Sequence, residues 1–197
     1  MAFVFFNCSA LKSLDLSKFD TSQVTSMSRM FYNCSSLITL DLSNFDTSKV
    51  KIMSLMFCHC SKVNSLNISD FNTSQVTNME RMFHNCEFLN SLNLSNFDTS
   101  QVTNMNKMFY NCSSLKALNL SSFNISDFND LNNLFNGELN TGNINLTISN
   151  SNGEIKDIFL STYPNLMICR ENIDDISLNS LKKINIYCNY NTNYKQY

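Results

Sequence analysis

The sequence predicts an α/β repeat solenoid, a right-handed coil with one parallel sheet and one short helix in each coil. Three observations support this prediction. A 26-residue unit recurs along the chain, each unit opens with a strand-like alternation, and each continues with apolar residues at helical spacing. A constant period of about 20 to 50 residues is typical of stacked supersecondary units that share a core with their neighbours.

The repeat is marked most clearly by a Met-Phe pair and a cysteine that follows it. The pairs occupy 30–31, 56–57, 82–83 and 108–109, and Leu134-Phe135 continues the step. The same interval separates the members of three further series: Leu14, Leu40, Leu66, Leu92 and Leu118; Phe19, Phe45, Phe71, Phe97 and Phe123; and Cys8, Cys34, Cys60, Cys86 and Cys112. We therefore divide the chain into a truncated first repeat at 1–10, five repeats at 11–140 with a degenerate last one, and divergent repeats with a C-terminal cap and tail at 141–197.

Each unit begins with a predicted strand. In Leu14-Asp15-Leu16 apolar and polar residues alternate, which is typical of a strand with one buried face. Beyond residue 140, weaker alternation predicts further strands at 144–146, 166–168 and 184–186. We expect the phenylalanines that begin with Phe19 to stack as a continuous column where the chain leaves the sheet.

A short helix is predicted after each strand. Asp20-Thr21-Ser22 supplies short oxygen side chains that can cap a helix start. The residues that follow are spaced so that one helical face is apolar. In the first full unit these residues are Val24, Met27, Phe31 and Cys34.

Composition excludes several classes of function. Charged residues make up 15% of the chain and asparagine fills 32 of 197 positions, giving a net charge of −2 without a basic stripe. Nucleic-acid binding rests on phosphate neutralisation, so no nucleic-acid partner is expected. No segment approaches the roughly 20 apolar residues of a membrane span. No catalytic motif is present and His59 and His84 lack an evident partner, so an enzyme is not expected.

Eight cysteines raise the question of disulfides or metal. Five occupy one repeat position and are expected to stack as buried thiols, since free cysteine behaves as a small hydrophobe. Bridges between neighbouring coils are the alternative. Cys58-His59-Cys60 has two potential ligand types, but adjacent residues of a helix point in different directions and no second cysteine pair follows. Neither a metal site nor a cofactor is therefore expected.

The outward face of the predicted strands holds the candidate partner-binding residues. They are polar and recur once in each coil: Ser13, Asp15, Thr39, Asp41, Ser65, Asn67, Ser91, Asn93 and Asn119. The sheet is where such solenoids offer an extended surface to a partner. A solvent-facing polar ladder without a ligand is the alternative. On the predicted helix, Arg29, Tyr32 and Cys58 are expected to face water.

The repeated string resembles a known family. Residues 30–50 read MFYNCSSLxxLDLSNFDTSxV, and this string is similar to the 26-residue repeat of bacterial surface proteins. These are the BspA-like leucine-rich repeat proteins, which overlap a family of unknown function first noted in mycoplasma lipoproteins. The resemblance covers about residues 4–140. It implies a leucine-rich-repeat-like coil, a role in adhesion, a place at the cell surface or in the secreted fraction for the full-length parent, and no catalytic residues.

Residues and resemblance lead to one functional hypothesis and one alternative. The hypothesis is a protein-binding solenoid from a surface or adhesion protein, with a host or neighbouring-cell surface protein as partner. The alternative is a structural spacer or stalk with no ligand of its own. Val4 and Phe5 align with Met30 and Phe31, so the chain opens inside a repeat, and we expect it to be a fragment or a truncated product.

Overall fold

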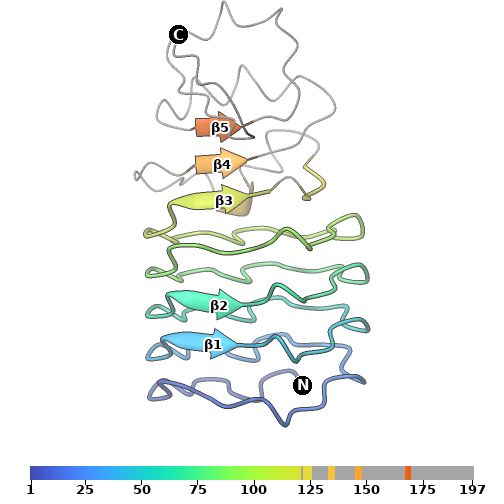
Figure 1. Cartoon of the computed structure of the whole chain (residues 1–197), viewed down its shortest axis with the longest axis vertical. Helices are drawn as coiled ribbons and strands as arrows, with labels where there is room; N and C mark the ends of the chain where they lie inside the picture. The colour runs from blue at the N-terminus through green and yellow to red at the C-terminus, as the bar shows by residue number, and fades with distance from the viewer. Residues whose placement is uncertain (121, 126–132, 136–144, 148–166, 170–197) are drawn as a thin grey trace, which may run out of the picture.

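The computed structural model describes residues 1–120, 122–125, 133–135, 145–147 and 167–169. Successive repeats lie one above another as the coils of a stack, with the labelled strands on one side of it (Figure 1). The strands are short: β1 (Thr39–Asp41), β2 (Ser65–Asn67), β3 (Ala117–Asn119), β4 (Asn145–Thr147) and β5 (Met167–Cys169). The strand predicted at 184–186 lies outside the described residues, as does most of the predicted cap and tail.

Neighbouring strands pair in parallel and follow the repeat. Leu40 in β1 lies opposite Leu66 in β2, at the equivalent position one repeat further along the chain. Leu118 pairs with Leu146, and Leu146 with Ile168. The number of residues between paired positions is therefore larger than the 26-residue repeat at the first of these pairs and smaller at the second. The strands form two sheets, β1-β2 and β3-β4-β5. The single sheet that was predicted is interrupted, because residues 91–93 of the intervening coil form no strand.

No helix forms over 24–34, where apolar spacing predicted one; consecutive turns occupy the segment. Arg29 and Asn33 within it have φ of 54° and 56°. The same two positions are left-handed in other coils: Phe3, Leu55, Arg81 and Lys107 at the first, and Asn7, His59, Asn85 and Asn111 at the second. A right-handed helix cannot contain such residues, and asparagine tolerates them better than most. In the part of the chain that the structure describes, no helix has the length and apolar character of a membrane span.

Hydrogen bonds of the turn segment run between coils. The N–H groups of Met27, Arg29, Phe31 and Asn33 donate to the carbonyl oxygens of Ile52, Ser54, Met56 and Cys58 over 2.8–3.0 Å. Parallel bridges join Ser26 to Ile52, and Ile52 to Asn78. A helix would have used these N–H groups internally. We call this set of bonds the turn ladder; it joins each coil to the next separately from the strands.

The Asp-Thr-Ser segment forms a turn in place of the predicted helix cap. Ser48 N–H donates to Asp46 Oδ1 at 2.9 Å, the side-chain-to-main-chain bond of an Asx turn. Thr47 between them is buried. Its Oγ1 donates to the carbonyl of Asn72 in the next coil at 3.0 Å and accepts from the Asn72 N–H at 2.8 Å. One hydroxyl therefore satisfies two main-chain groups of the neighbouring coil.

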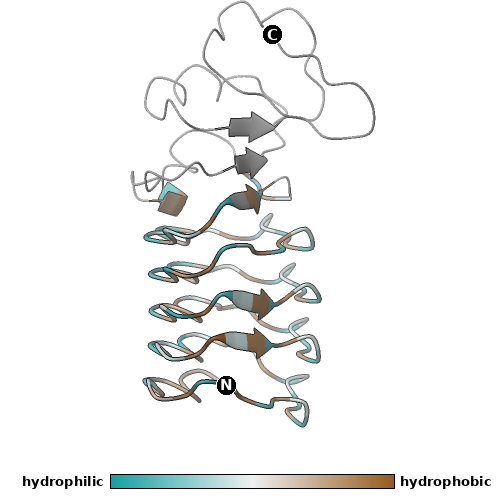
Figure 2. Ribbon diagram, turned by 60° about the vertical axis from the view of Figure 1, so that its left-hand side comes forward, coloured by the Kyte–Doolittle hydropathy of each residue, from teal (hydrophilic) through white to brown (hydrophobic). Residues whose placement is uncertain are grey.

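The core runs through the stack without a break. One unit contributes nine residues that are each at most 4% exposed: Leu37, Leu40, Leu42, Phe45, Val50, Met53, Met56, Phe57 and Cys60. Figure 2 shows the same order of hydrophilic and hydrophobic segments from coil to coil. The inward positions predicted from the repeat are thus confirmed, although no helix presents them in this unit or over 24–34; helical residues occur at 133–135.

Aromatic stacking involves a different series from the one predicted. Neighbouring rings lie 5.3–5.7 Å apart and within 7° of parallel along Phe5, Phe31, Phe57, Phe83 and Phe109. We call this series the phenylalanine column. In the series that begins with Phe19, the described contact between coils is Phe97 with Phe123 at 6.4 Å. The predicted continuous column was therefore wrong. The turn ladder passes through the observed series and holds its rings in register.

Candidate functional site

The predicted partner-binding residues lie at exposed positions of the strand segments. All nine are exposed: Ser13, Asp15, Thr39, Asp41, Ser65, Asn67, Ser91, Asn93 and Asn119. In β1 and β2 the residues alternate exposed, buried, exposed. The predicted orientation of this surface, which we call the strand face, is confirmed, while its binding of a partner stays a prediction.

Hydrogen bonds tie parts of the strand face together. Asn67 Nδ2 donates to Asp41 Oδ1 in the preceding coil at 3.0 Å. Asp41 Oδ1 also accepts from the Ser43 N–H at 3.0 Å, and Asp15 Oδ1 accepts from the Ser17 N–H at 2.9 Å. The hydrogen bond from the backbone of Ser43 lowers the pKa of Asp41, and that from Ser17 lowers the pKa of Asp15. Both carboxylates are ionised at neutral pH and are unsuited to act as general acids.

The repeated cysteines are free and, after the first, buried. Cys8 is exposed, whereas Cys34, Cys60, Cys86 and Cys112 lie in the core. Each buried Sγ donates to a phenylalanine carbonyl of the preceding coil at 3.1–3.2 Å, respectively Phe5, Phe31, Phe57 and Phe83. Burial raises the pKa of Cys34 to about 11 and that of Cys112 to about 12. These four cysteines are therefore structural thiols rather than nucleophiles, which confirms the predicted buried ladder for them.

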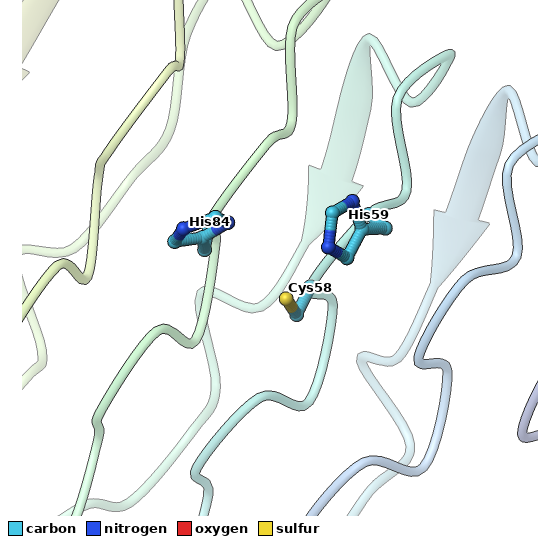
Figure 3. A group of neighbouring side chains, drawn as sticks. All are labelled: Cys58, His59 and His84. Carbon is cyan, nitrogen blue, oxygen red and sulfur yellow. The ribbon is translucent and has the colours of Figure 1, made fainter.

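A departure from the repeat brings three potential ligand side chains together. One ligand atom from each of Cys58, His59 and His84 lies within 4.8 Å of the others. Cys58 and His59 belong to one coil and His84 to the next (Figure 3). We call this group the Cys-His cluster. Cys60 is not part of it, since its thiol is bonded to the Phe31 carbonyl.

On the predicted helix the side chains of Cys58 and His59 would point in different directions, but turns occupy this segment instead. His59 has φ of 64°, so the chain turns at this residue and the side chains of Cys58 and His59 lie side by side. Cys58 was expected to face water, but it is 2% exposed. The signal that could have identified the cluster is the repeat itself, because cysteine and histidine replace its usual residues at neighbouring positions.

Burial controls the protonation of Cys58 and His84. It lowers the pKa of His84 to about 4, with His59, Arg81 and Lys107 adding to the shift, so the imidazole is neutral at pH 7. Burial also raises the pKa of Cys58 to about 12, against the opposing effect of Arg81 and Arg29. Without a further positive charge beside it, Cys58 remains a thiol at neutral pH.

Comparison with known proteins identifies the family. The family described as "Mycoplasma protein of unknown function, DUF285" matches the chain twice, over residues 1–92 and 38–151. Overlapping matches are expected of a chain built from one repeated unit. No curated protein and no solved structure matches the chain. Because the two matches together extend over more than half of its residues, the chain belongs to the DUF285 family.

Proposed function

We propose that this chain is the protein-binding repeat region of a cell-surface or adhesion-type protein, with a right-handed, leucine-rich-repeat-like solenoid as its fold. The observation that carries the proposal is the strand face, where polar side chains recur in every coil and are all exposed. The partner is a protein on the surface of a host or neighbouring cell. The resemblance of the repeat to BspA-like surface proteins supports the same assignment.

The chemistry of the strand face favours binding through several coils at once. Thr39 lies opposite Ser65, and Asp41 opposite Asn67, so equivalent groups recur at the spacing of paired strands, about 4.8 Å. Neither aromatic residues nor arginine, which dominate binding hot spots, stand among the nine residues of this face. Each coil therefore contributes little, and clustering of whole chains is expected to increase the apparent affinity strongly.

A structural spacer is the second candidate. The observation in its favour is that Asp41 accepts hydrogen bonds from both Asn67 and Ser43. Polar groups that are satisfied within the chain have less to offer a partner. A spacer requires only that the coils hold one another rigidly, and it predicts no ligand for the strand face.

Binding of monomeric and tetramerised protein to a panel of immobilised cell-surface and extracellular-matrix proteins separates the two candidates. We expect tetramers to bind and monomers to bind weakly. Asp41→Lys combined with Asn67→Lys should abolish tetramer binding, because it replaces two neighbouring groups of the strand face. The matched control is Asp70→Lys with Gln75→Lys, which changes the charge equally at exposed positions where Lys18 and Lys49 stand in other coils.

Each result of this experiment favours one candidate. Loss of binding in the strand-face variant and retention in the control would support the protein-binding function. Equal binding by the strand-face variant and the unaltered tetramer would remove the strand face as the site. Tetramers that bind no protein of the panel would favour the spacer.

A further inference from the structure

We propose that Cys58, His59 and His84 bind one transition-metal ion, for which Zn²⁺ is the best chemical match, between two neighbouring coils. The site does not depend on the function proposed for the strand face, because neither its residues nor its test involve that face.

The three residues replace the usual ones at two repeat positions. At the first position, Cys58 and His84 stand where other coils have Phe6, Tyr32 and Tyr110. At the second position, His59 stands where other coils have asparagine. The Phe6 and Tyr32 rings stack at 5.0 Å, and the His84 and Tyr110 rings at 4.8 Å. Cys58 has no ring and interrupts this aromatic row. The departures thus fall together at one point of the stack, on residues that are all metal ligands.

The His59 ring extends across the interruption. Its centroid lies 5.6 Å from that of Tyr32 in the preceding coil and 5.6 Å from that of His84 in the next. The ring therefore lies beside Cys58, as Figure 3 shows, and faces His84 across the space between two coils. An ion held here would join two coils that the turn ladder already keeps in register.

The ligand atoms are near the separation that a metal requires. They lie within 4.8 Å of one another. Zinc takes nitrogen at about 2.0–2.1 Å and sulfur at about 2.3 Å, which places tetrahedral ligands roughly 3.5 Å apart. The difference, about 1 Å, would have to be closed by rotation of the side chains. Two imidazoles with one thiolate suit zinc, and His59 and His84 are exposed enough to admit water as the fourth ligand.

Two polar atoms without partners lie at the cluster. His84 Nδ1 is buried and has no hydrogen-bond partner, and in the tautomer with its proton on Nε2 the Nδ1 lone pair is available to a cation. Asn85 Oδ1 is likewise buried without a partner, while Asn85 Nδ2 lies 3.0 Å from His59 Nδ1. Turning the Asn85 amide by half a rotation would place Oδ1 against His59 Nδ1–H. His59 would then present Nε2 to the metal, supported by the kind of outer hydrogen bond that zinc-bound histidines have.

Three positively charged side chains lie near enough to the cluster to affect its ionisation. Arg29, Arg81 and Lys107 act on Cys58 or His84, and Arg81 is paired with Glu80 at 3.2 Å. Arg81 and Arg29 favour the thiolate form of Cys58, and that thiolate would offset one positive charge of the bound ion. His84 is neutral and needs to lose no proton. The Cys58 thiol releases its proton as the Zn–S bond forms.

The test is metal titration of the reduced, chelator-treated full chain. The background protein for the titration carries serine in place of Cys8, Cys169 and Cys188. Its cysteines are then those of the buried ladder and Cys58 of the cluster. We expect one Zn²⁺ per chain by calorimetry. Co²⁺ should give a thiolate-to-cobalt charge-transfer band and visible bands of tetrahedral intensity, and Zn²⁺ should displace it.

Variants that restore the repeat are the sharpest controls, since they are expected to fold. His59→Asn and His84→Tyr introduce the residues found at these positions in other coils. Each should weaken Zn²⁺ binding by more than a hundredfold, and Cys58→Ser should abolish the charge-transfer band. Asn85→Ala should weaken binding by about 10–100-fold, the usual effect of losing an outer hydrogen bond to a metal ligand. Cys60→Ala should leave the cobalt spectrum unchanged.

Thermal melting provides the second readout. Zn²⁺ should raise the Tm of the unaltered chain and leave that of His59→Asn unchanged. A charge-transfer band that persists in Cys58→Ser would overturn the proposal, as would equal Zn²⁺ affinity in His59→Asn and the background protein. Absence of stoichiometric binding in the unaltered chain would overturn it as well.

Discussion

Phe57→Ala tests the phenylalanine column. The Phe57 side chain is fully buried and stacks on Phe31 and Phe83, with ring centroids 5.6 Å away on each side. Truncating a buried phenylalanine costs about 3–5 kcal/mol. Two stacked pairs, at about 0.5–1.5 kcal/mol each beyond burial, place the expected loss in the upper part of that range. Phe57→Leu keeps most of the volume and should lose about 1–3 kcal/mol, the share of the two stacks.

Thermal and urea unfolding followed by circular dichroism measure these losses. For a chain of this size each kcal/mol lowers Tm by about 2–4 °C, so Phe57→Ala should melt about 8–20 °C lower. The matched control is Phe88→Ala, which removes the same atoms from a ring that is 59% exposed. The control should melt within about 2 °C of the unaltered chain, since exposed substitutions change stability by less than about 0.5 kcal/mol. Equal shifts for Phe57→Ala and Phe88→Ala would refute the assignment of Phe57 to the core.

Three further predictions follow from bonds between and within coils. Thr73→Val should lower the free energy of unfolding in urea by about 2–4 kcal/mol, because it leaves the N–H and the carbonyl of Asp98 in the next coil unpaired. The control Thr39→Val, on the exposed strand, should lower it by less than about 0.5 kcal/mol. Native alkylation followed by mass spectrometry should modify Cys8 alone among the cysteines up to Cys112, and labelling of the buried thiols at an equal rate would contradict their placement. The side-chain and backbone hydrogen bonds of Ser48 lower the pKa of Asp46, so the stabilisation is present above the ordinary value of 3.8 and is lost as pH falls towards the folded pKa. Asp46→Asn, which keeps the acceptor, should therefore make Tm less sensitive to pH below 4; an unchanged pH profile would argue against the turn's contribution.

The repeat made the pairing and the core predictable, because a constant step places equivalent residues opposite one another. Leu40 and Leu66 are an example, since their spacing alone predicts their register. The helix could not be excluded in the same way. Inward residues are spaced along consecutive turns much as they are along one face of a helix. In the sequence, the sign that favours turns is asparagine at positions such as Asn33, which is left-handed in the structure.

The stacked phenylalanines and the Cys-His cluster required the structure. A period identifies which residues recur but not which of the recurring rings meet, and that depends on where the turn ladder fixes the coils. Comparison of equivalent positions singles out Cys58 and His84, which share one position, and His59, which replaces an asparagine, but it does not give the distances between their side chains. Their proximity follows from the left-handed turn at His59, which the assumption of a helix had concealed.

The turn ladder also gives the stack a direction. Within it, Met27, Arg29 and Phe31 all donate their N–H groups towards the C-terminal end, and carbonyls such as that of Ser28 accept from the N-terminal side. One end of a run of coils therefore offers mainly acceptors along this segment, and the other end mainly donors. Two such runs can continue each other's ladder only head to tail, because like ends would oppose carbonyl to carbonyl or N–H to N–H. Polymerisation of isolated coils, where it occurs by this route, is consequently open-ended and cannot close as a symmetric dimer.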